Sequence, residues 1–139
     1  MRHVESQVGF TLIELLIAVG IFTIALLSVG FSILSISDLS ELSREKIAAT
    51  ADANRVLEAM RDTANNSLTT LKSTDWNLWA TNNVINGKGT NEIQLNQENI
   101  VTTFPNPSND PVQVSLTVNW WHKQRPYSYQ ITTLMADRT

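Results

Sequence analysis

The sequence contains no cysteine and only two histidines, His3 and His122. The absence of cysteine excludes disulfides and thiol nucleophiles, so the fold must depend on packing alone. His3 lies near the amino terminus and His122 in a predicted turn, and two such residues do not make a metal site. Neither a Gly-x-Ser-x-Gly nor a His-Glu-x-x-His motif occurs. We therefore expect no metal, no cofactor and no enzymatic activity.

Charge is scarce over one long stretch. Between Phe10 and Ile36 the single ionisable residue is Glu14. This run exceeds the roughly 20 residues that a helix needs to cross a bilayer, so it predicts one membrane span. The rest of the 139 residues has the charge density of a soluble domain and suffices for one modest domain. The chain is predicted to consist of an anchor and a head.

The flanks of the apolar run predict its orientation. Residues 1–9 carry Arg2 and the terminal amine against a single acid, Glu5. Basic flanks favour the cytoplasm, so we expect the head outside. A secretory signal peptide cleaved after Ser28-Val29-Gly30 is an alternative, although the apolar character continues to Ile36.

Glu14 argues against an ordinary anchor, because an acid in mid-membrane costs about 2.5–3.5 kcal/mol. Cleavage after Gly9 would offset this cost, since it leaves the ammonium group of Phe10 only four residues away. Between helices staggered along one axis, the amine of one chain could meet the Glu14 of the next and neutralise it. Glu14 would then set the register of an assembly.

Residues Gly9-Phe10-Thr11-Leu12-Ile13-Glu14, followed by Leu15-Leu16-Ile17-Ala18, closely resemble the processing site and N-terminal helix of type IV prepilins and pseudopilins. The resemblance implies that residues 1–9 are a leader, which a prepilin peptidase removes between Gly9 and Phe10. It also implies methylation of the new Phe10 amine. Glu14 matches the family glutamate that pairs with a neighbouring subunit's amino terminus.

One feature departs from this family. Many pilins carry a proline in this helix, whereas here the only weak helix formers are Gly20 and Gly30. These glycines either bend the helix or let neighbouring helices approach closely, and we favour close approach.

The apolar pattern becomes one-sided beyond residue 37, which predicts an amphipathic helix over about residues 38–71. No glycine or proline occurs between Phe31 and Gly87, so one helix could run from Phe10 to about Leu71. Its acids, Glu41, Glu45, Asp52, Glu58 and Asp62, are expected on the solvated face. The apolar stripe, which we assign to the core of the head, comprises Leu39, Leu42, Ala49, Ala53, Val56 or Leu57, Met60, Ala64 and Leu68.

Residues 72–91 are predicted to be an irregular connection in which Trp76 and Trp79 are buried. Gly87-Lys88-Gly89 lacks the spacing of a phosphate-binding loop and is predicted to be a turn. The prolines of residues 105–111 exclude a central strand there.

The last third predicts antiparallel strands. Residues 112–120 alternate apolar and polar, which indicates a strand with one buried face. Residues 127–135 follow after a turn at 122–126, giving a hairpin. Glu92–Leu95 and Ile100–Phe104 are shorter candidate strands. Three or four strands should pack against the amphipathic helix.

The hairpin also offers a candidate contact surface. If Trp120 points inward, Trp121 points outward, where it either meets a neighbouring molecule or covers the rim of the sheet. Lys123 and Arg125 lie beside it. This small patch could contact a nucleic acid, although a hairpin tip with solvated charges is the commoner situation.

Together these observations predict an α+β fold in which a long N-terminal helix packs against a small antiparallel sheet, as in type IV pilins. Residues 1–9 form the leader, 10–37 the membrane and assembly helix, and 38–139 the head. We expect a minor pilin that resides in the cytoplasmic membrane with its head outside before it enters a pilus. Its partners would be other pilin subunits, the prepilin peptidase and the inner-membrane assembly platform. A pseudopilin of a type II secretion system and a membrane-anchored ligand- or DNA-binding domain are the alternatives.

Overall fold

The computed structural model describes residues 11–136. The predicted cleavage site at Gly9 and Phe10 lies outside the described residues. The chain divides into two compact units, Met1–Ser40 and Glu41–Thr139. Helix α1 (Leu12–Asn66) contributes to both units.

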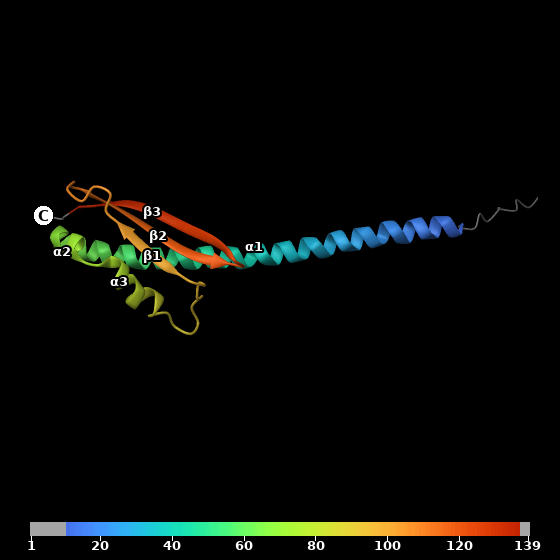
Figure 1. Ribbon diagram of the computed structural model, residues 1–139, viewed down its shortest axis with the longest axis horizontal. Coiled ribbons are helices and arrows are strands. Elements are labelled where there is room, and N and C mark those ends of the chain that lie inside the picture. The colour runs from blue at the N-terminus through green and yellow to red at the C-terminus, as the bar shows by residue number, and fades with distance from the viewer. Residues whose placement is uncertain (1–10, 137–139) are drawn as a thin grey trace, which may run out of the picture. The chain divides into compact units, whose positions relative to one another are not determined.

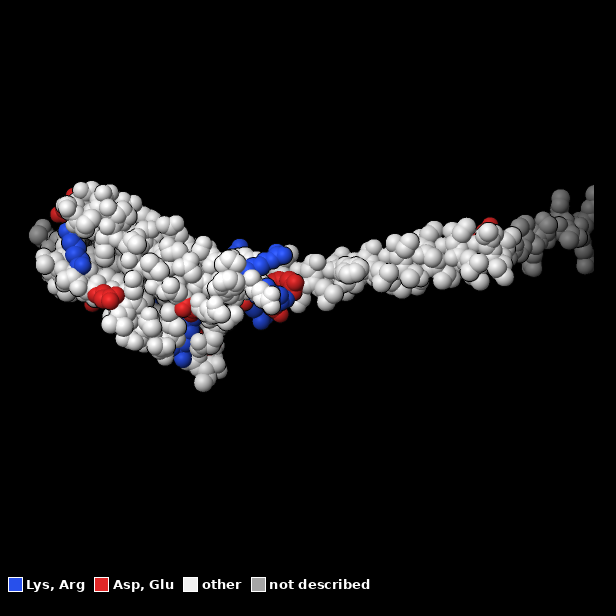
Figure 2. Space-filling model, viewed as in Figure 1, with Lys and Arg blue, Asp and Glu red and all other residues white. Residues whose placement is uncertain are grey.

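The first unit is the apolar part of α1. Every large apolar side chain from Leu12 to Ile36 is at least 56% exposed. This helix is long and apolar enough to cross a membrane, as its sequence predicts. Its visible face carries almost no charged side chains (Figure 2). So large an exposed apolar surface requires lipid or other protein to cover it.

The second unit combines the remainder of α1 with three short helical segments and one antiparallel sheet, which Figure 1 shows lying along this part of α1. This arrangement confirms the predicted α+β fold. The strands follow one another in the order β1-β2-β3, and each neighbouring pair is antiparallel. The elements after α1 are α2 (Leu68–Ser73), α3 (Trp76–Ala80), the π-helical turn η1 (Thr81–Ile85), β1 (Asn99–Thr103), β2 (Val112–His122) and β3 (Arg125–Met135).

The core of the head lies between α1 and the central strand, β2. The predicted alternation along β2 is confirmed, because the side chains of Val112, Val114, Leu116, Val118 and Trp120 are all buried. The helix contributes Ala49, Ala53, Val56, Leu57, Met60 and Ala64, each at most 2% exposed. The predicted stripe was wrong at Leu39, which is 65% exposed, whereas Leu42 is half-buried.

The long helix ends earlier than the sequence predicted. α1 stops at Asn66, and Ser67 takes an extended conformation with φ −169° and ψ 117°. The Ser67 hydroxyl accepts a hydrogen bond from the backbone N–H of Thr70 at 3.2 Å, which caps α2. A serine side chain that bonds to the backbone in this way competes with helix continuation.

The connection that we expected to be irregular contains a helix. Asp75 caps α3 by accepting hydrogen bonds from the backbone N–H groups of Asn77 and Leu78, at 3.1 and 3.0 Å. The predicted burial of the tryptophans is confirmed for Trp76, which is 4% exposed, and Trp79 packs half-buried against the same core.

Two strand predictions need correction. Glu92–Leu95 forms no strand, because Glu92 closes a turn in which its backbone N–H donates to the Gly89 carbonyl and its carboxylate accepts from the Gly89 N–H. The hairpin turn is also tighter than predicted. Only Lys123 and Gln124 lie between the strands, with φ of 45° and 67°, the left-handed values of a two-residue hairpin turn.

Candidate functional site

The start of α1 holds Glu14 in a capping box. Its Oε2 accepts hydrogen bonds from the Thr11 backbone N–H at 2.9 Å and from the Thr11 hydroxyl at 2.8 Å. In return, the Glu14 N–H donates to the Thr11 hydroxyl oxygen at 3.4 Å. This is the reciprocal pattern of Thr-x-x-Glu at a helix N-terminus. The sequence analysis missed it, although the spacing of Thr11 and Glu14 is the signal that identifies it.

The capping box gives Glu14 a role within its own chain. Both hydrogen bonds from Thr11 end on Oε2, and a carboxylate in the first turn also interacts favourably with the helix dipole. The predicted pairing with a neighbouring subunit involves the amine of Phe10, which lies outside the described residues. That pairing stays a prediction, and the cap is an additional reason for an acid at this position.

The hydroxyl groups of the apolar part of α1 bond within the helix. Thr23, Ser28, Ser32 and Ser35 each donate to the carbonyl four residues earlier, at 2.8–3.0 Å. In a medium without water, a hydroxyl group has to find its hydrogen-bond partner within the protein, and these four find it in their own helix. Apart from its neighbours and the adjoining helix backbone, a Cβ atom added at Gly20 or at Gly30 would meet no atom of the described residues within 4 Å. Within one chain, therefore, neither glycine is required by a close contact.

The hairpin tip places the predicted contact residues on different faces. Trp120 is buried and Trp121 is 40% exposed, as the alternation predicted. Arg125 pairs with His122, whose side chain faces inward, whereas Trp121 pairs with Pro126 on the opposite face. Lys123 forms an ion pair with Glu41 at 3.2 Å. The structure thus places Trp121 and Arg125 on different faces of the hairpin and Lys123 beside Glu41, and a contact of these residues with a partner stays a prediction.

His122 was wrongly placed in the turn. It is the last residue of β2, it is only 9% exposed, and its Nδ1 lies 2.9 Å from Glu45 Oε1. The other oxygen of Glu45 accepts a hydrogen bond from Trp120 Nε1 at 3.0 Å. Glu45 therefore joins α1 to the end of β2, and it is not on a fully solvated face as predicted.

A buried cluster of charges is the least expected feature of the head. Lys88 Nζ lies 2.8 Å from Asp52 Oδ2 and 2.5 Å from Glu98 Oε2. The exposed fractions of these side chains are 2% for Lys88, 5% for Asp52 and 1% for Glu98. We call these three residues the buried triad. The prediction that Asp52 is solvated was wrong. Lys88 lies between turns at residues 86–87 and 90–91, and the sequence analysis did not foresee that its side chain is buried.

The position of Asp52 in the helix contained the signal that was overlooked. It lies three residues after Ala49 and four before Val56, both of which are in the core. Residues at these spacings share one face of a helix. Asp52 therefore lies on the buried stripe, where an acid requires a partner.

Burial and pairing shift the ionisation of the triad in opposite ways. Burial raises the pKa of Glu98, and the negative charge of nearby Asp52 raises it further. The ammonium of Lys88 lowers this pKa, but the net shift is upward. For Lys88, burial disfavours the charged form, but hydrogen bonds to Asp52 and Glu98 hold its pKa above the ordinary value. Glu98 Oε1 is buried and has no hydrogen-bond partner among the described residues.

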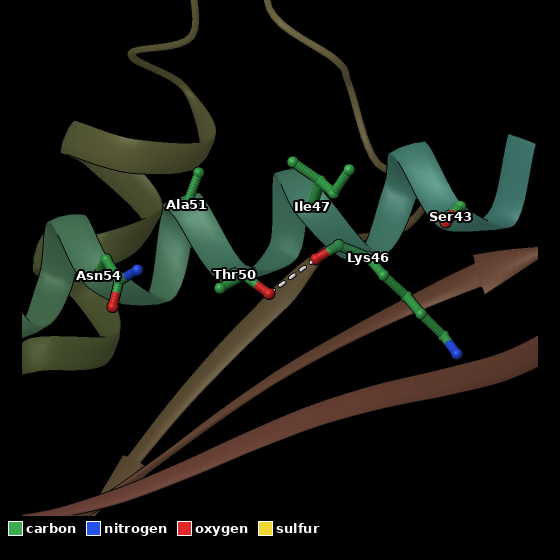
Figure 3. Close-up of a pocket in the computed structure, with 6 residues that line it drawn as sticks. All are labelled: Ser43, Lys46, Ile47, Thr50, Ala51 and Asn54. Atoms are coloured by element: carbon green, nitrogen blue, oxygen red, sulfur yellow. Dashed lines mark hydrogen bonds between the residues drawn. The ribbon is translucent and has the colours of Figure 1, made fainter. Parts of the chain in front are cut away.

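The surface of the head, as far as the structure describes it, includes a larger and a smaller hollow. The larger, of about 430 Å³, is lined by Ser43, Lys46, Ile47, Thr50, Ala51 and Asn54. All six belong to α1, as Figure 3 shows, so this hollow is an open groove along one helix. The smaller, of about 160 Å³, lies between α1 and residues 88–93, and Asp52 and Lys88 are among its lining residues.

Charged side chains of both signs lie close together on the visible face of the head (Figure 2). Within residues 11–136, no group of three or more histidines and acids could hold a metal ion. Comparison with known protein families, characterised proteins and solved structures found no match for this chain.

Proposed function

We propose that this chain is a structural, non-enzymatic subunit of a type IV filament, and more specifically a minor pilin. The observation that carries the proposal is the position of Glu14. It lies in the first turn of an exposed apolar helix, directly after residues Gly9–Ile13, which resemble a prepilin processing site.

In the proposed mechanism, the chain first resides in the cytoplasmic membrane with its head outside. A prepilin peptidase hydrolyses the Gly9–Phe10 peptide bond, which leaves a carboxylate on the leader and an amine on Phe10. The amine is then methylated. It remains cationic, and Glu14 of a neighbouring subunit neutralises it as the helix moves from lipid into the shaft of the filament.

The properties of α1 support this mechanism. Its apolar side chains are exposed from Leu12 to Ile36 and need a cover, which lipid supplies before assembly and other subunits supply afterwards. The Thr11–Glu14 cap keeps the carboxylate at the amino end of the helix, close to where a Phe10 amine would form.

The decisive experiment is coexpression of the full chain with a prepilin peptidase, followed by measurement of the intact mass. We expect the mass of a chain that begins at Phe10 with an added methyl group. The matched control is coexpression with a catalytically inactive peptidase, which should leave Met1 in place.

Other masses would contradict the proposal. An uncut chain in the presence of active peptidase would overturn the filament assignment and favour a membrane-anchored binding domain. A chain that begins at Phe31 would identify a secretory signal peptide. If the cut is made after Gly9, neighbouring genes separate a pilus from a type II secretion system, and the abundance of the subunit in purified fibres separates a minor from a major pilin.

A further inference from the structure

The buried triad fastens one segment of the head to α1 and joins the two ends of that segment to each other. Lys88 follows the turn after η1, and Glu98 immediately precedes β1. Both side chains reach the same cluster with Asp52 of α1. The segment 86–98 has no helix or strand of its own. It is tied to α1 through the contact of Lys88 with Asp52, and Glu98 contacts that same ammonium from the other end of the segment.

The number of charges in the triad is unbalanced. When all three groups are ionised, one ammonium faces two carboxylates, and the cluster carries a net charge of −1 at exposed fractions of 1–5%. An uncompensated buried charge costs more free energy than a cluster whose charges balance. A proton on the Glu98 carboxyl removes the excess, and its unpartnered oxygen Oε1 is an atom available to carry that proton.

The surroundings leave this imbalance in place. Arg55 of α1 interacts with Asp52, and Glu92 of the segment interacts with Lys88. These two groups form an ion pair with each other, so together they add no net charge to the cluster. On the sheet side, the first residue pair after Glu98 is Asn99 with Asn119, which is uncharged. The small hollow is lined by two members of the triad, Asp52 and Lys88, so the cluster lies just beneath the surface of the head.

We propose that the buried triad is a proton-linked latch, in which a protonated Glu98 holds segment 86–98 against α1 and a deprotonated Glu98 loosens it. The latch is independent of the filament assignment, because it involves only residues of the head.

The direction of the pH dependence follows from Glu98. Its pKa in the folded chain is raised above the ordinary value of about 4.3. The folded state therefore binds the proton more tightly than the unfolded state does. The stabilisation is fully present below the unfolded value and is lost as the pH rises through the raised folded value.

The test compares the full chain with its Glu98→Gln variant in detergent micelles. Urea unfolding is followed by the fluorescence of Trp76, Trp79, Trp120 and Trp121, all of which lie in the head. We expect the urea midpoint of the wild type to fall as the pH rises from 4 to 8, relative to that of the variant, in which residue 98 stays neutral. The control is Glu58→Gln, at an exposed site on α1. Its urea midpoint should change with pH as that of the wild type does. If the urea midpoints of the wild type and of Glu98→Gln change in parallel between pH 4 and 8, the latch is excluded.

Two readouts on the wild type keep the proposal testable if the variant does not fold. Carboxyl ¹³C chemical shifts of a glutamate-labelled chain should contain one glutamate that titrates at higher pH than the exposed glutamates. Hydrogen exchange of residues 86–98, after correction for the intrinsic rate, should accelerate through the same pH range, whereas exchange of β2 should not. If every glutamate titrates at or below the value of the exposed ones, or if the segment's protection is independent of pH, the proposal is wrong.

Discussion

The two parts of α1 use the same secondary structure in opposite ways. From Leu12 to Ile36 the large apolar side chains are exposed, whereas from Ala49 to Ala64 the apolar stripe is almost completely buried. Composition alone does not explain the difference, since the exposed part is the more apolar one. What differs is the partner, because the sheet of the same chain covers the second part, and the first part needs a cover from outside the chain.

The two parts also differ in how they satisfy polar groups. In the apolar part, hydroxyls bond to carbonyls four residues away, and Glu14 bonds to Thr11 three residues away. In the head, Asp52 and Glu45 meet partners that are distant in the sequence, Lys88 and His122. This difference can be tested with variants that change either the apolar part of α1 or the head and leave the other unchanged.

The largest expected effect is on assembly, and it separates the two roles of Glu14. Glu14→Gln should abolish incorporation into filaments, because a neutral side chain does not neutralise a neighbour's amine. Thr11→Val removes the hydroxyl of the capping box and keeps the carboxylate, so it should cost about 1 kcal/mol of helix stability and leave assembly in place. Sedimentation of sheared filaments measures incorporation, and intact mass verifies cleavage of both variants.

Equal assembly of Glu14→Gln and wild type, with the leader removed from both, would exclude the proposed charge pairing. If Glu14→Gln and Thr11→Val instead lose filament incorporation equally, the role of Glu14 in assembly is to cap the helix and not to neutralise a neighbour's amine.

An intermediate effect is expected on the stability of the head. Leu57 is 1% exposed, and Leu57→Ala should lower the free energy of unfolding by about 2–5 kcal/mol through lost burial and a cavity. Leu27 is 58% exposed, and Leu27→Ala in the apolar part should leave the urea midpoint of the head unchanged. Tryptophan fluorescence in micelles measures both variants. A matching loss in Leu27→Ala would show that the two parts unfold as one unit.

The smallest expected effect concerns the ion pair of Arg55 and Glu92, which is partly exposed. Arg55, together with the Gly89 N–H, lowers the pKa of Glu92. Its stabilisation is therefore present above the unfolded pKa and is lost as the pH falls through the lower folded value. Glu92→Gln should reduce the urea midpoint slightly at pH 7, and the difference should close in acid and in high salt. A difference that widens in acid would contradict this assignment.

The sequence predicted features that depend on local pattern. The apolar run is a feature of local composition, and the amphipathic stripe from Ala49 to Ala64 and the alternation of β2 are periodic. The structure confirms each of them. The α+β layout follows from these elements. The capping box was equally local, since it requires only the spacing of Thr11 and Glu14, and a search for that motif would have found it.

The errors arose where partners are distant or where one side chain competes with the backbone. The burial of Asp52 depends on Lys88 and Glu98, which pattern reasoning does not bring to the same place. Likewise, His122 extends β2 by pairing with Arg125, and its side chain meets Glu45, which lies on a helix far away in the sequence. The end of α1 depends on one hydroxyl, that of Ser67, whose bond to Thr70 replaces a helical turn.

The hydroxyl bonds inside the apolar part of α1 have a further consequence. The acceptors of the four hydroxyl groups, those of Thr23, Ser28, Ser32 and Ser35, belong to the same helix. If the helix moved from lipid into a protein interior, no hydrogen bond would therefore be exchanged at these positions. Such a move alters mainly van der Waals contacts, which are individually weak and quickly re-formed. At these four positions, therefore, a change from one apolar surrounding to another meets no polar barrier, and Glu14 is the residue of this part whose charge must still be satisfied.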